Sequence, residues 1–182
     1  QAVFAEFDAP KVPEELESEL VLDDVAAAVG LQPTEIGLEN YKPSLWSAGV
    51  PGVFIPVRNL AAIGRARPVM GRWERAFGKI SGAYLYCRET LHTTSHFHAR
   101  KFAPGHGVLE DPATGSAAAA FAGVVHRFDN LPTGEHRYKI EQGYEMGRPS
   151  TSELTISVQG SHVHSVRIGG YAVRVSDGEI EV

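Results

Sequence analysis

Residues Gly107–Gly123 read GVLEDPATGSAAAAFAG, and this stretch decides how the middle of the chain folds. Pro112 cannot lie inside a helix, because it has no backbone N–H and its ring clashes with the preceding turn. A helix must therefore begin after it, among the cap-type residues Thr114–Ser116, and the alanines that follow are the best intrinsic helix formers. We predict a helix over Ser116–Phe128.

The start of this helix has the properties of an anion-binding site. Its first backbone N–H groups have no partner within the helix, the helix dipole makes this end positive, and Gly115 has no side chain to block a ligand. Small residues at a helix start therefore suit a carboxylate. The alternative is purely structural: Thr114 or Ser116 caps the helix and nothing binds there.

Two acidic residues, Glu110 and Asp111, precede the helix start. A carboxyl group beside an anion site is repelled by the bound anion and attracted by the helix end. Opposed influences of this kind give a group a pKa suited to proton transfer. On the structural alternative, Asp111 only begins a turn with Pro112.

Outside this stretch, hydrophobic periodicity predicts several strands and a few short helices. The predicted strands are Val3–Phe7, Ile36–Ser44, Val53–Val57, Ala83–Cys87, Ser95–Phe102, Arg137–Gln142, Leu154–Val158, and a pair, Ser165–Ile168 and Ala172–Val175, around Gly169-Gly170. A tight hairpin is predicted at Asp177-Gly178, before Glu179–Val182. The predicted helices run from Glu14 to Gly30, from an Asn59 cap to Ile63, and over Met70–Phe77. We expect an α+β fold with a strongly bent, mostly antiparallel sheet around the central helix.

Composition excludes some classes of function. The 182 residues carry a formal net charge of -5, which argues against a nucleic-acid-binding protein. No apolar run is long enough to cross a bilayer, and the single cysteine, Cys87, cannot form an internal disulfide. We therefore expect a cytoplasmic protein without membrane contact. Cys87 lies in a buried-strand pattern and is expected in the core.

The string Glu-Asp-Pro-Ala-Thr-Gly-Ser-Ala at residues 110–117 resembles the signature of the phenazine-biosynthesis PhzF-like isomerases, here preceded by Arg100–Pro104. Other stretches resemble the family in order and spacing, so the likeness covers nearly the whole chain. They are Ser47–Pro51 leading into Phe54–Val57, Gln142-Gly143 followed by Met146–Ser150, and Val166–Val175.

This resemblance implies the diaminopimelate-epimerase-like fold, in which two similar domains each wrap a curved sheet round a helix and the active site lies between them. It implies proton transfer on a small carboxylate-bearing metabolite without metal, flavin or nicotinamide. Asp111 would be the active-site aspartate, and Thr114, Gly115 and Ser116 would hold the substrate carboxylate. Family members also carry a glutamate base and a Gly-His pair in the amino-terminal domain, and no stretch here matches either motif.

The chain opens Gln1-Ala2-Val3-Phe4 without Met, which suggests that an amino-terminal segment precedes it. We expect residues 1–42 to be the end of an incomplete first domain and residues 43–182 to be the second domain, with the junction at Lys42-Pro43. The first part needs a partner surface for four apolar side chains: Leu16, Leu20, Val25 and Leu31. Residues 1–182 alone are expected to be inactive, because the general base lies outside them. A homodimer is a further expected assembly.

The histidines and several other residues allow alternative interpretations. His96 with His98, and His162 with His164, alternate along strands and would suit zinc if the strands met, but no cysteine or carboxylate cluster completes a site, so no metal is expected. A two-thiol mechanism is excluded by the single cysteine. Arg148 is expected at the surface rather than on a substrate carboxylate, and Trp46 and Trp73 in the core. The rival function is a non-catalytic small-anion-binding or regulatory protein with the same fold.

Overall fold

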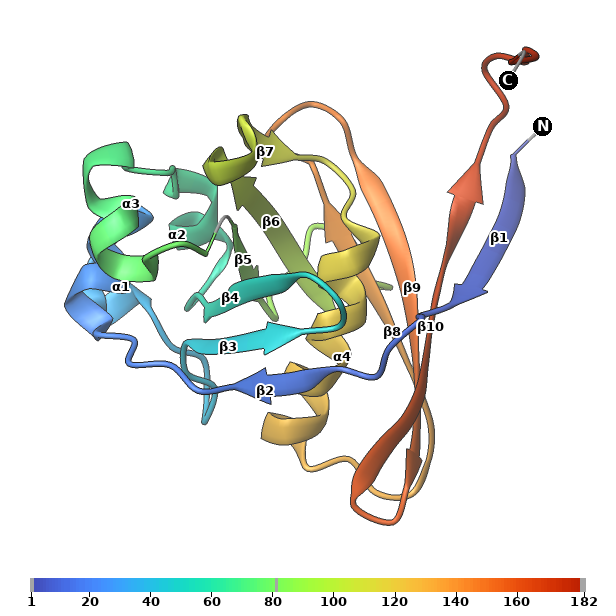
Figure 1. Cartoon of the computed structure of the whole chain (residues 1–182), viewed down its shortest axis with the longest axis horizontal. Helices are drawn as coiled ribbons and strands as arrows, with labels where there is room; N and C mark the ends of the chain where they lie inside the picture. The colour runs from blue at the N-terminus through green and yellow to red at the C-terminus, as the bar shows by residue number, and fades with distance from the viewer. Residues whose placement is uncertain (1, 81, 181–182) are drawn as a thin grey trace.

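The computed structural model describes residues 2–80 and 82–180, whose strands form one curved sheet (Figure 1). The strands are β1 Val3–Asp8, β2 Glu14–Leu16, β3 Ser44–Ser47, β4 Pro51–Pro56, β5 Ala83–Cys87, β6 Phe97–Ala103, β7 Val108–Asp111, β8 Gly134–Gln142, β9 Ser150–Gln159 and β10 His162–Ala172. The helices are α1 Leu22–Ala28, α2 Leu60–Arg65, α3 Met70–Phe77 and α4 Gly115–Asp129, with 3₁₀ turns η1 Pro33–Glu35 and η2 Pro104–His106. None of the helices in these described ranges is long and apolar enough to span a membrane.

The sheet runs in the order β1-β10-β9-β8-β6-β5-β4-β3-β2, and β7 pairs with β6. Among the described strands, the pairings β4–β5 and β6–β8 are parallel and the others are antiparallel. The predicted α+β class with a mostly antiparallel sheet around a helix is therefore confirmed.

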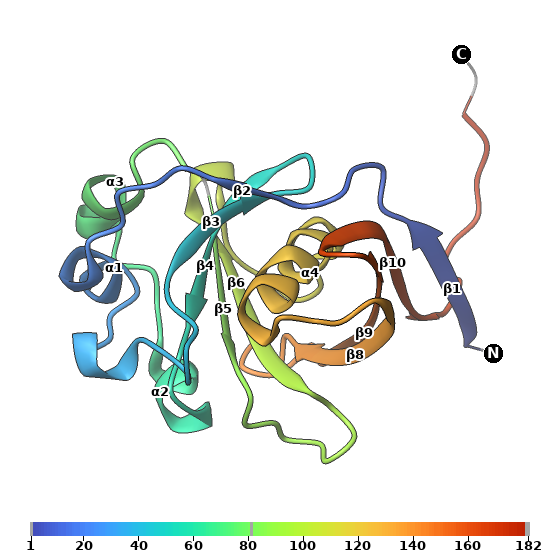
Figure 2. The same cartoon turned by 90° about the horizontal axis from the view of Figure 1, so that it is seen from below.

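Helix α4 lies inside the curl of the sheet, as the view along the helix axis shows (Figure 2). It contacts strands from both ends of the sheet, β9 and β10 at one end and β2 and β3 at the other. The ring of Phe121 packs against Phe54, Tyr84, Tyr86 and Phe97 at the centre of this core. Two residues later a Cβ on Gly123 would lie 2.4 Å from the Trp46 ring, so glycine lets the helix approach β3. The predicted central helix is confirmed.

Helices α1, α2 and α3 cover the outer face of β4–β6 and form a second core (Figure 2). Val25 and Leu31 are buried in this core, and Leu20 packs against it. For these three side chains the expectation of a missing partner surface is therefore wrong, because the chain itself covers them, whereas Leu16 at the sheet edge is only partly buried. The division into residues 1–42 and 43–182 stays a prediction, although β1 and β2 pair with strands beyond residue 43.

The helix predicted from Glu14 is shorter than expected. Residues Glu14–Leu16 form the edge strand β2, paired with Leu45–Ser47 of β3, and the helix begins only at Leu22. The strand predicted over Ile36–Ser44 is also wrong: this stretch, which follows η1, contains only two isolated bridges, Ile36 with Val57 and Leu38 with Tyr41, and β3 begins at Ser44. At Glu14–Leu16, pairing at the sheet edge outweighs the local helical periodicity.

The hairpin predicted around Gly169-Gly170 is also wrong, because β10 runs straight through both glycines. The turn between β9 and β10 lies instead at Gly160, whose φ is +60°. Gly169 has a packing role: a Cβ there would lie 2.6 Å from the ring of Phe4 on β1. Residues 173–180, including Asp177-Gly178, have no regular structure, and the last two residues of that predicted hairpin lie outside the described residues.

Candidate active site

A cavity of about 440 Å³ opens between the end of β6, strand β7, the start of α4 and the β3–β4 turn. Asp111, Thr114 and Ser116 line it, so the fold brings these three predicted residues together. Gly115 lies beside them but faces Phe7, whose ring would be 3.6 Å from a Cβ at this position. The other lining residues are Val50, Pro51, Phe54, Lys101, Ala103, His106, Val108 and Ala117.

The start of α4 is not closed by a side-chain cap. Thr114 occupies the N-cap position, but its side chain accepts no hydrogen bond from the helix, and the first helical bond runs from the Ala118 N–H to the Thr114 carbonyl. The N–H groups of residues 115–117 consequently have no acceptor within the helix. The alternative that Thr114 merely caps the helix does not describe this geometry.

The hydroxyl of Thr114 turns instead toward Asp111. It donates to Asp111 Oδ2 at 2.7 Å and accepts from Gln142 Nε2 at 3.0 Å. The same Gln142 nitrogen donates to the Asp111 carbonyl at 2.6 Å. Gln142 is buried at the end of β8, so it orients both residues without lining the cavity. Sequence reasoning assigned Gln142 no role beyond the resemblance of its stretch to the family.

The turn after β8 holds the Asp111–Thr114 loop in place. Gly143 has φ +81°, and a Cβ there would lie 2.4 Å from the Arg148 carbonyl oxygen and 2.8 Å from that of Pro112. Beyond the turn, the Ser150 hydroxyl donates to the Pro112 carbonyl at 2.8 Å. Arg148 itself is exposed on this turn and does not line the cavity, in keeping with the predicted surface position.

Strand alternation separates the two acidic residues of the motif. Asp111 pairs directly with Lys101 across β6–β7, and both side chains point to the α4 side. Glu110, opposite Phe102, points to the other side and forms a two-bond ion pair with Arg100, with both N···O distances at 2.8 Å. Glu110 is therefore a structural residue and does not share the cavity with Asp111.

Lys101 is a site residue that sequence reasoning missed. Burial lowers the pKa of its ammonium to about 8, although the nearby Asp111 acts in the opposite direction. Among the described residues, no carboxylate lies within the 4.0 Å of a salt bridge to Lys101. The sequence signal for Lys101 was weak. It is a charged residue in a strand whose apolar side chains point alternately into the two hydrophobic cores.

On the face of β6 opposite the cavity, the Arg100–Glu110 ion pair continues into a network that contains Glu145 and His98. His98 lies between Glu141 and Glu145, at 2.9 Å from an oxygen of each. Burial alone would lower the pKa of His98, but these two hydrogen bonds outweigh it and raise the pKa above its ordinary value. Cys87 is buried opposite His98, and burial raises the pKa of its thiol to about 12, so the expected core position is confirmed. Trp46 and Trp73 are also buried, as expected.

The histidine pairs do not meet. His96 accepts a hydrogen bond from the Lys139 N–H just before β6, and His98 on β6 is held by Glu141 of β8 and by Glu145. His162 and His164 are exposed on β10, which is not a neighbour of β6. In the part of the chain that the structure describes, no three His, Cys, Asp or Glu side chains form a group that could hold a metal ion.

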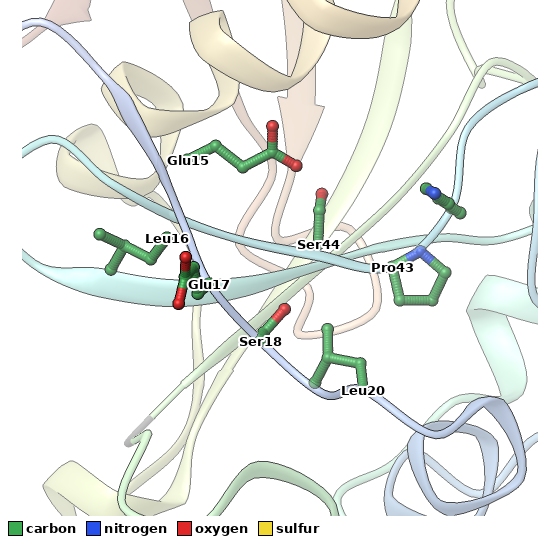
Figure 3. A pocket seen from close by; sticks show the side chains of 8 residues that line it. Glu15, Leu16, Glu17, Ser18, Leu20, Pro43 and Ser44 are labelled. Carbon is green, nitrogen blue, oxygen red and sulfur yellow. The ribbon is translucent and has the colours of Figure 1, made fainter.

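A larger cavity lies elsewhere, and acidic side chains outnumber basic ones in its lining. This groove of about 600 Å³ runs between the extended segment after β2 and the residues just before β3 (Figure 3). Glu15 and Glu17 line it, with Lys42 as its basic residue. It shares no lining residue with the cavity at the α4 start. A carboxylate ligand is therefore favoured at the smaller cavity.

Known proteins resemble this chain over almost all of its length. It is 50% identical over 184 residues to an uncharacterised isomerase of Mesorhizobium japonicum, covering 98% of this chain and 61% of that protein. It is 30% identical over 155 residues to the trans-2,3-dihydro-3-hydroxyanthranilate isomerase of Pseudomonas aeruginosa, covering 85% of this chain and 51% of that protein. The chain thus spans between half and two thirds of the length of these relatives.

The fold is shared with solved structures. A Bacillus anthracis phenazine biosynthesis protein of the PhzF family superposes with a TM-score of 0.85 at 22% identity, covering 98% of this chain and 61% of that one. The sequence profile of the family described as phenazine biosynthesis-like protein, PhzC-PhzF, matches residues 1–178. The chain therefore belongs to the phenazine biosynthesis-like (PhzC-PhzF) family.

Proposed function

We propose that this protein is a cofactor-independent isomerase that moves a proton on a small carboxylate-bearing metabolite. One observation carries the proposal: the Asp111 carboxylate and the uncapped start of α4 face the same cavity of about 440 Å³. A ligand whose carboxylate binds the helix start would place its neighbouring carbon atoms near Asp111. This is the arrangement that proton transfer beside a carboxylate requires.

The α4 start would hold the substrate carboxylate. The N–H groups of residues 115–117 point out of the helix start and lie where its dipole is positive. Thr114 and Ser116 both line the cavity at this helix start. The binding energy would orient the substrate and offset its charge during the reaction.

Asp111 would exchange a proton with the substrate. One of its oxygens is held by the Thr114 hydroxyl, which is in turn held by Gln142, so the carboxylate has a defined direction. The second partner in the transfer is expected in a segment that precedes Gln1, as the family resemblance implies. That residues 1–182 are inactive without this segment stays a prediction.

We propose that this preceding segment packs near β1. Strand β1 lies at one edge of the sheet, and it exposes the apolar side chains Val3, Phe4 and Phe7, next to the exposed Tyr171 of β10. Exposed apolar patches of this kind mark interaction surfaces. Because Phe7 also contacts the Gly115 position, a segment covering β1 would lie beside the α4 start. A second copy of the chain is the other occupant to consider.

The substrate named for three relatives, trans-2,3-dihydro-3-hydroxyanthranilate, is the first compound to test. The full-length protein, including the segment proposed to precede Gln1, would be incubated with it in heavy water, and both product formation and deuterium incorporation would be followed by NMR. In Asp111→Asn we expect turnover to fall by roughly 10²–10⁴-fold, the usual contribution of a general acid or base. Asp23→Asn, at an exposed position of α1, is the matched control and should leave turnover unchanged.

The rival proposal is a binding protein that keeps the fold and the anion site without catalysis. It predicts binding of the carboxylate at the α4 start with no exchange of carbon-bound protons. In the full-length protein, bound carboxylate without exchange of carbon-bound protons, or equal exchange rates for the parent protein and Asp111→Asn with both folded, would favour this rival over the isomerase.

A further inference from the structure

We propose that Lys101 is a specificity-determining residue, which selects substrates carrying a second acidic group by binding that group in the cavity while the α4 start binds the first carboxylate. This inference rests on the proposed function, because it assumes that the cavity receives a carboxylate. It adds the chemical class of the substrate: a small diacid, or an acid with a second anionic oxygen.

The position of Lys101 on β6 directs its side chain into the cavity. It is paired with Tyr84 on one side and with Asp111 on the other, and all three face α4. Gly82 makes room for the ammonium group, whereas a Cβ on Gly52 would only reach van der Waals contact with it. A Cβ on Gly82 would lie 2.6 Å from Lys101 Nζ, and one on Gly52 would lie 3.6 Å from it.

The charge of Lys101 is incompletely balanced by the protein. Within the described ranges no carboxylate forms a salt bridge with it, and the nearest acid in the pairing register, Asp111, is already bound through Oδ2 to Thr114. The lowering of its pKa to about 8 shows that burial has removed part of its hydration. A bound anion would restore that lost interaction.

Much of the remaining cavity lining is apolar, so Lys101 and the α4 start are the groups that distinguish one acid from another. Val50, Pro51 and Phe54 contribute apolar surface beside the Lys101 wall, and Ala117 contributes it beside the α4 wall. A volume of about 440 Å³ lies within the usual range for a small-molecule site. A monoacid bound at the helix start would leave the Lys101 ammonium without an anionic partner, whereas a diacid could satisfy both positions.

The test uses glutarate and butyrate, which have similar carbon skeletons and carry two carboxylates and one. Their dissociation constants would be measured by the shifts of the backbone amide signals of residues 115–117 in the ¹⁵N-labelled protein. We expect glutarate to bind about ten-fold or more tightly than butyrate near neutral pH, the effect of one charged hydrogen-bonded contact. In Lys101→Met this ratio should fall to about two, the statistical advantage of two ends, with the affinity for butyrate unchanged.

Two further measurements sharpen the test. Lys101→Arg keeps the charge and should retain most of the preference for glutarate. Raising the pH from about 7 to about 9.5 should also reduce the preference, because the Lys101 ammonium loses its proton across this range. The titratable groups that face it are Asp111 from β7, Tyr84 from β5 and His106 from η2. Burial raises the pKa of Tyr84, so its phenol stays neutral.

The outcomes separate this inference from the proposed function. If neither acid shifts the amides of residues 115–117, the anion site itself is wrong and both proposals fall. If butyrate binds there but glutarate has no advantage, or if the advantage survives in Lys101→Met, only the role of Lys101 is overturned. A glutarate preference that Met abolishes and Arg restores would support it.

Discussion

Two neighbouring pairs on β6 and β7 have the same chemistry and opposite surroundings. Arg100 and Glu110 form a closed pair whose side chains are 8% and 16% exposed, and the guanidinium also donates to the carbonyls of Ile63 and Ala66 at 2.9 and 2.8 Å. Lys101 and Asp111 lie one residue further along each strand, on the other face, and line an open cavity without forming a salt bridge.

This difference shows that residue type alone does not distinguish a structural ion pair from a binding site. Both pairs combine a base with an acid, but the Arg100 guanidinium can satisfy a carboxylate and two carbonyls at once through its rigid fork of donors. Lys101 has a single ammonium, and its paired aspartate is oriented by Thr114 instead. One pair therefore holds β6, β7 and α2 together, and the other leaves charges available to a ligand.

The largest effect on stability is expected from breaking the closed pair. Arg100→Met should lower the free energy of unfolding by about 3–5 kcal/mol, because it leaves Glu110 as an uncompensated, mostly buried charge. Lys101→Met should leave that free energy unchanged or raise it, since burial of the Lys101 ammonium is costly, as its lowered pKa indicates. Urea unfolding of both variants gives the comparison. Equal losses in the two variants would contradict it.

A smaller effect is expected from removing the hydrogen bonds that orient Asp111 at the cavity. Thr114→Val removes the hydroxyl that donates to Asp111 Oδ2 and accepts from Gln142. Losing one hydrogen bond of this kind should lower turnover roughly three- to ten-fold, with a stability loss of about 1 kcal/mol. Thr133→Val is the control, because its hydroxyl donates to the Gly160 carbonyl at an exposed turn. A steady-state assay in which both variants match the parent would show that Thr114 does not orient Asp111.

The smallest and most gradual effect is the pH dependence of the free energy of unfolding that arises from His98, which lies on the same face of β6 as the Arg100–Glu110 pair. The pKa of His98 is raised in the folded state, because its bonds to Glu145 and Glu141 outweigh the opposing effect of burial. The folded protein therefore binds this proton more tightly than the unfolded chain, so the stability it contributes is present below about pH 6.5 and is lost as the pH rises through the folded value. The unfolding free energies of the parent and His98→Gln should accordingly converge as the pH rises above about 6.5 and through the folded-state pKa. A difference that does not vary with pH would show that His98 is neutral throughout.

Much of the fold follows from local signals. Ala83–Cys87 and Met70–Phe77 coincide with β5 and α3, and the side chain of Asn59 accepts from the Ala62 N–H at the start of α2 as predicted. These elements were predictable because their periodicity and caps are confined to a few neighbouring residues. The errors at β2 and β10 concern segments whose state depends on partners far along the chain.

The candidate site divides in the same way. Asp111, Thr114 and Ser116 were identified because Pro112 and the following alanines place the helix start within the motif. Gln142 and Lys101 were not, since each reaches the cavity or its loop from a different strand. No local pattern states that the end of β8 will lie beside the Asp111 carbonyl.

The sequence by itself determined where α4 begins, because a proline cannot continue a helix and small residues followed by alanines start one. Only the tertiary structure decided which acid faces the cavity. The pairing of Asp111 with Lys101 and of Glu110 with Phe102, next to a register shift at Phe102/Ala103, sends the two acids to opposite faces. Side chains alternate along a strand, so a shift of one residue in this register would exchange their surroundings, and that register depends on contacts between strands rather than on either strand alone.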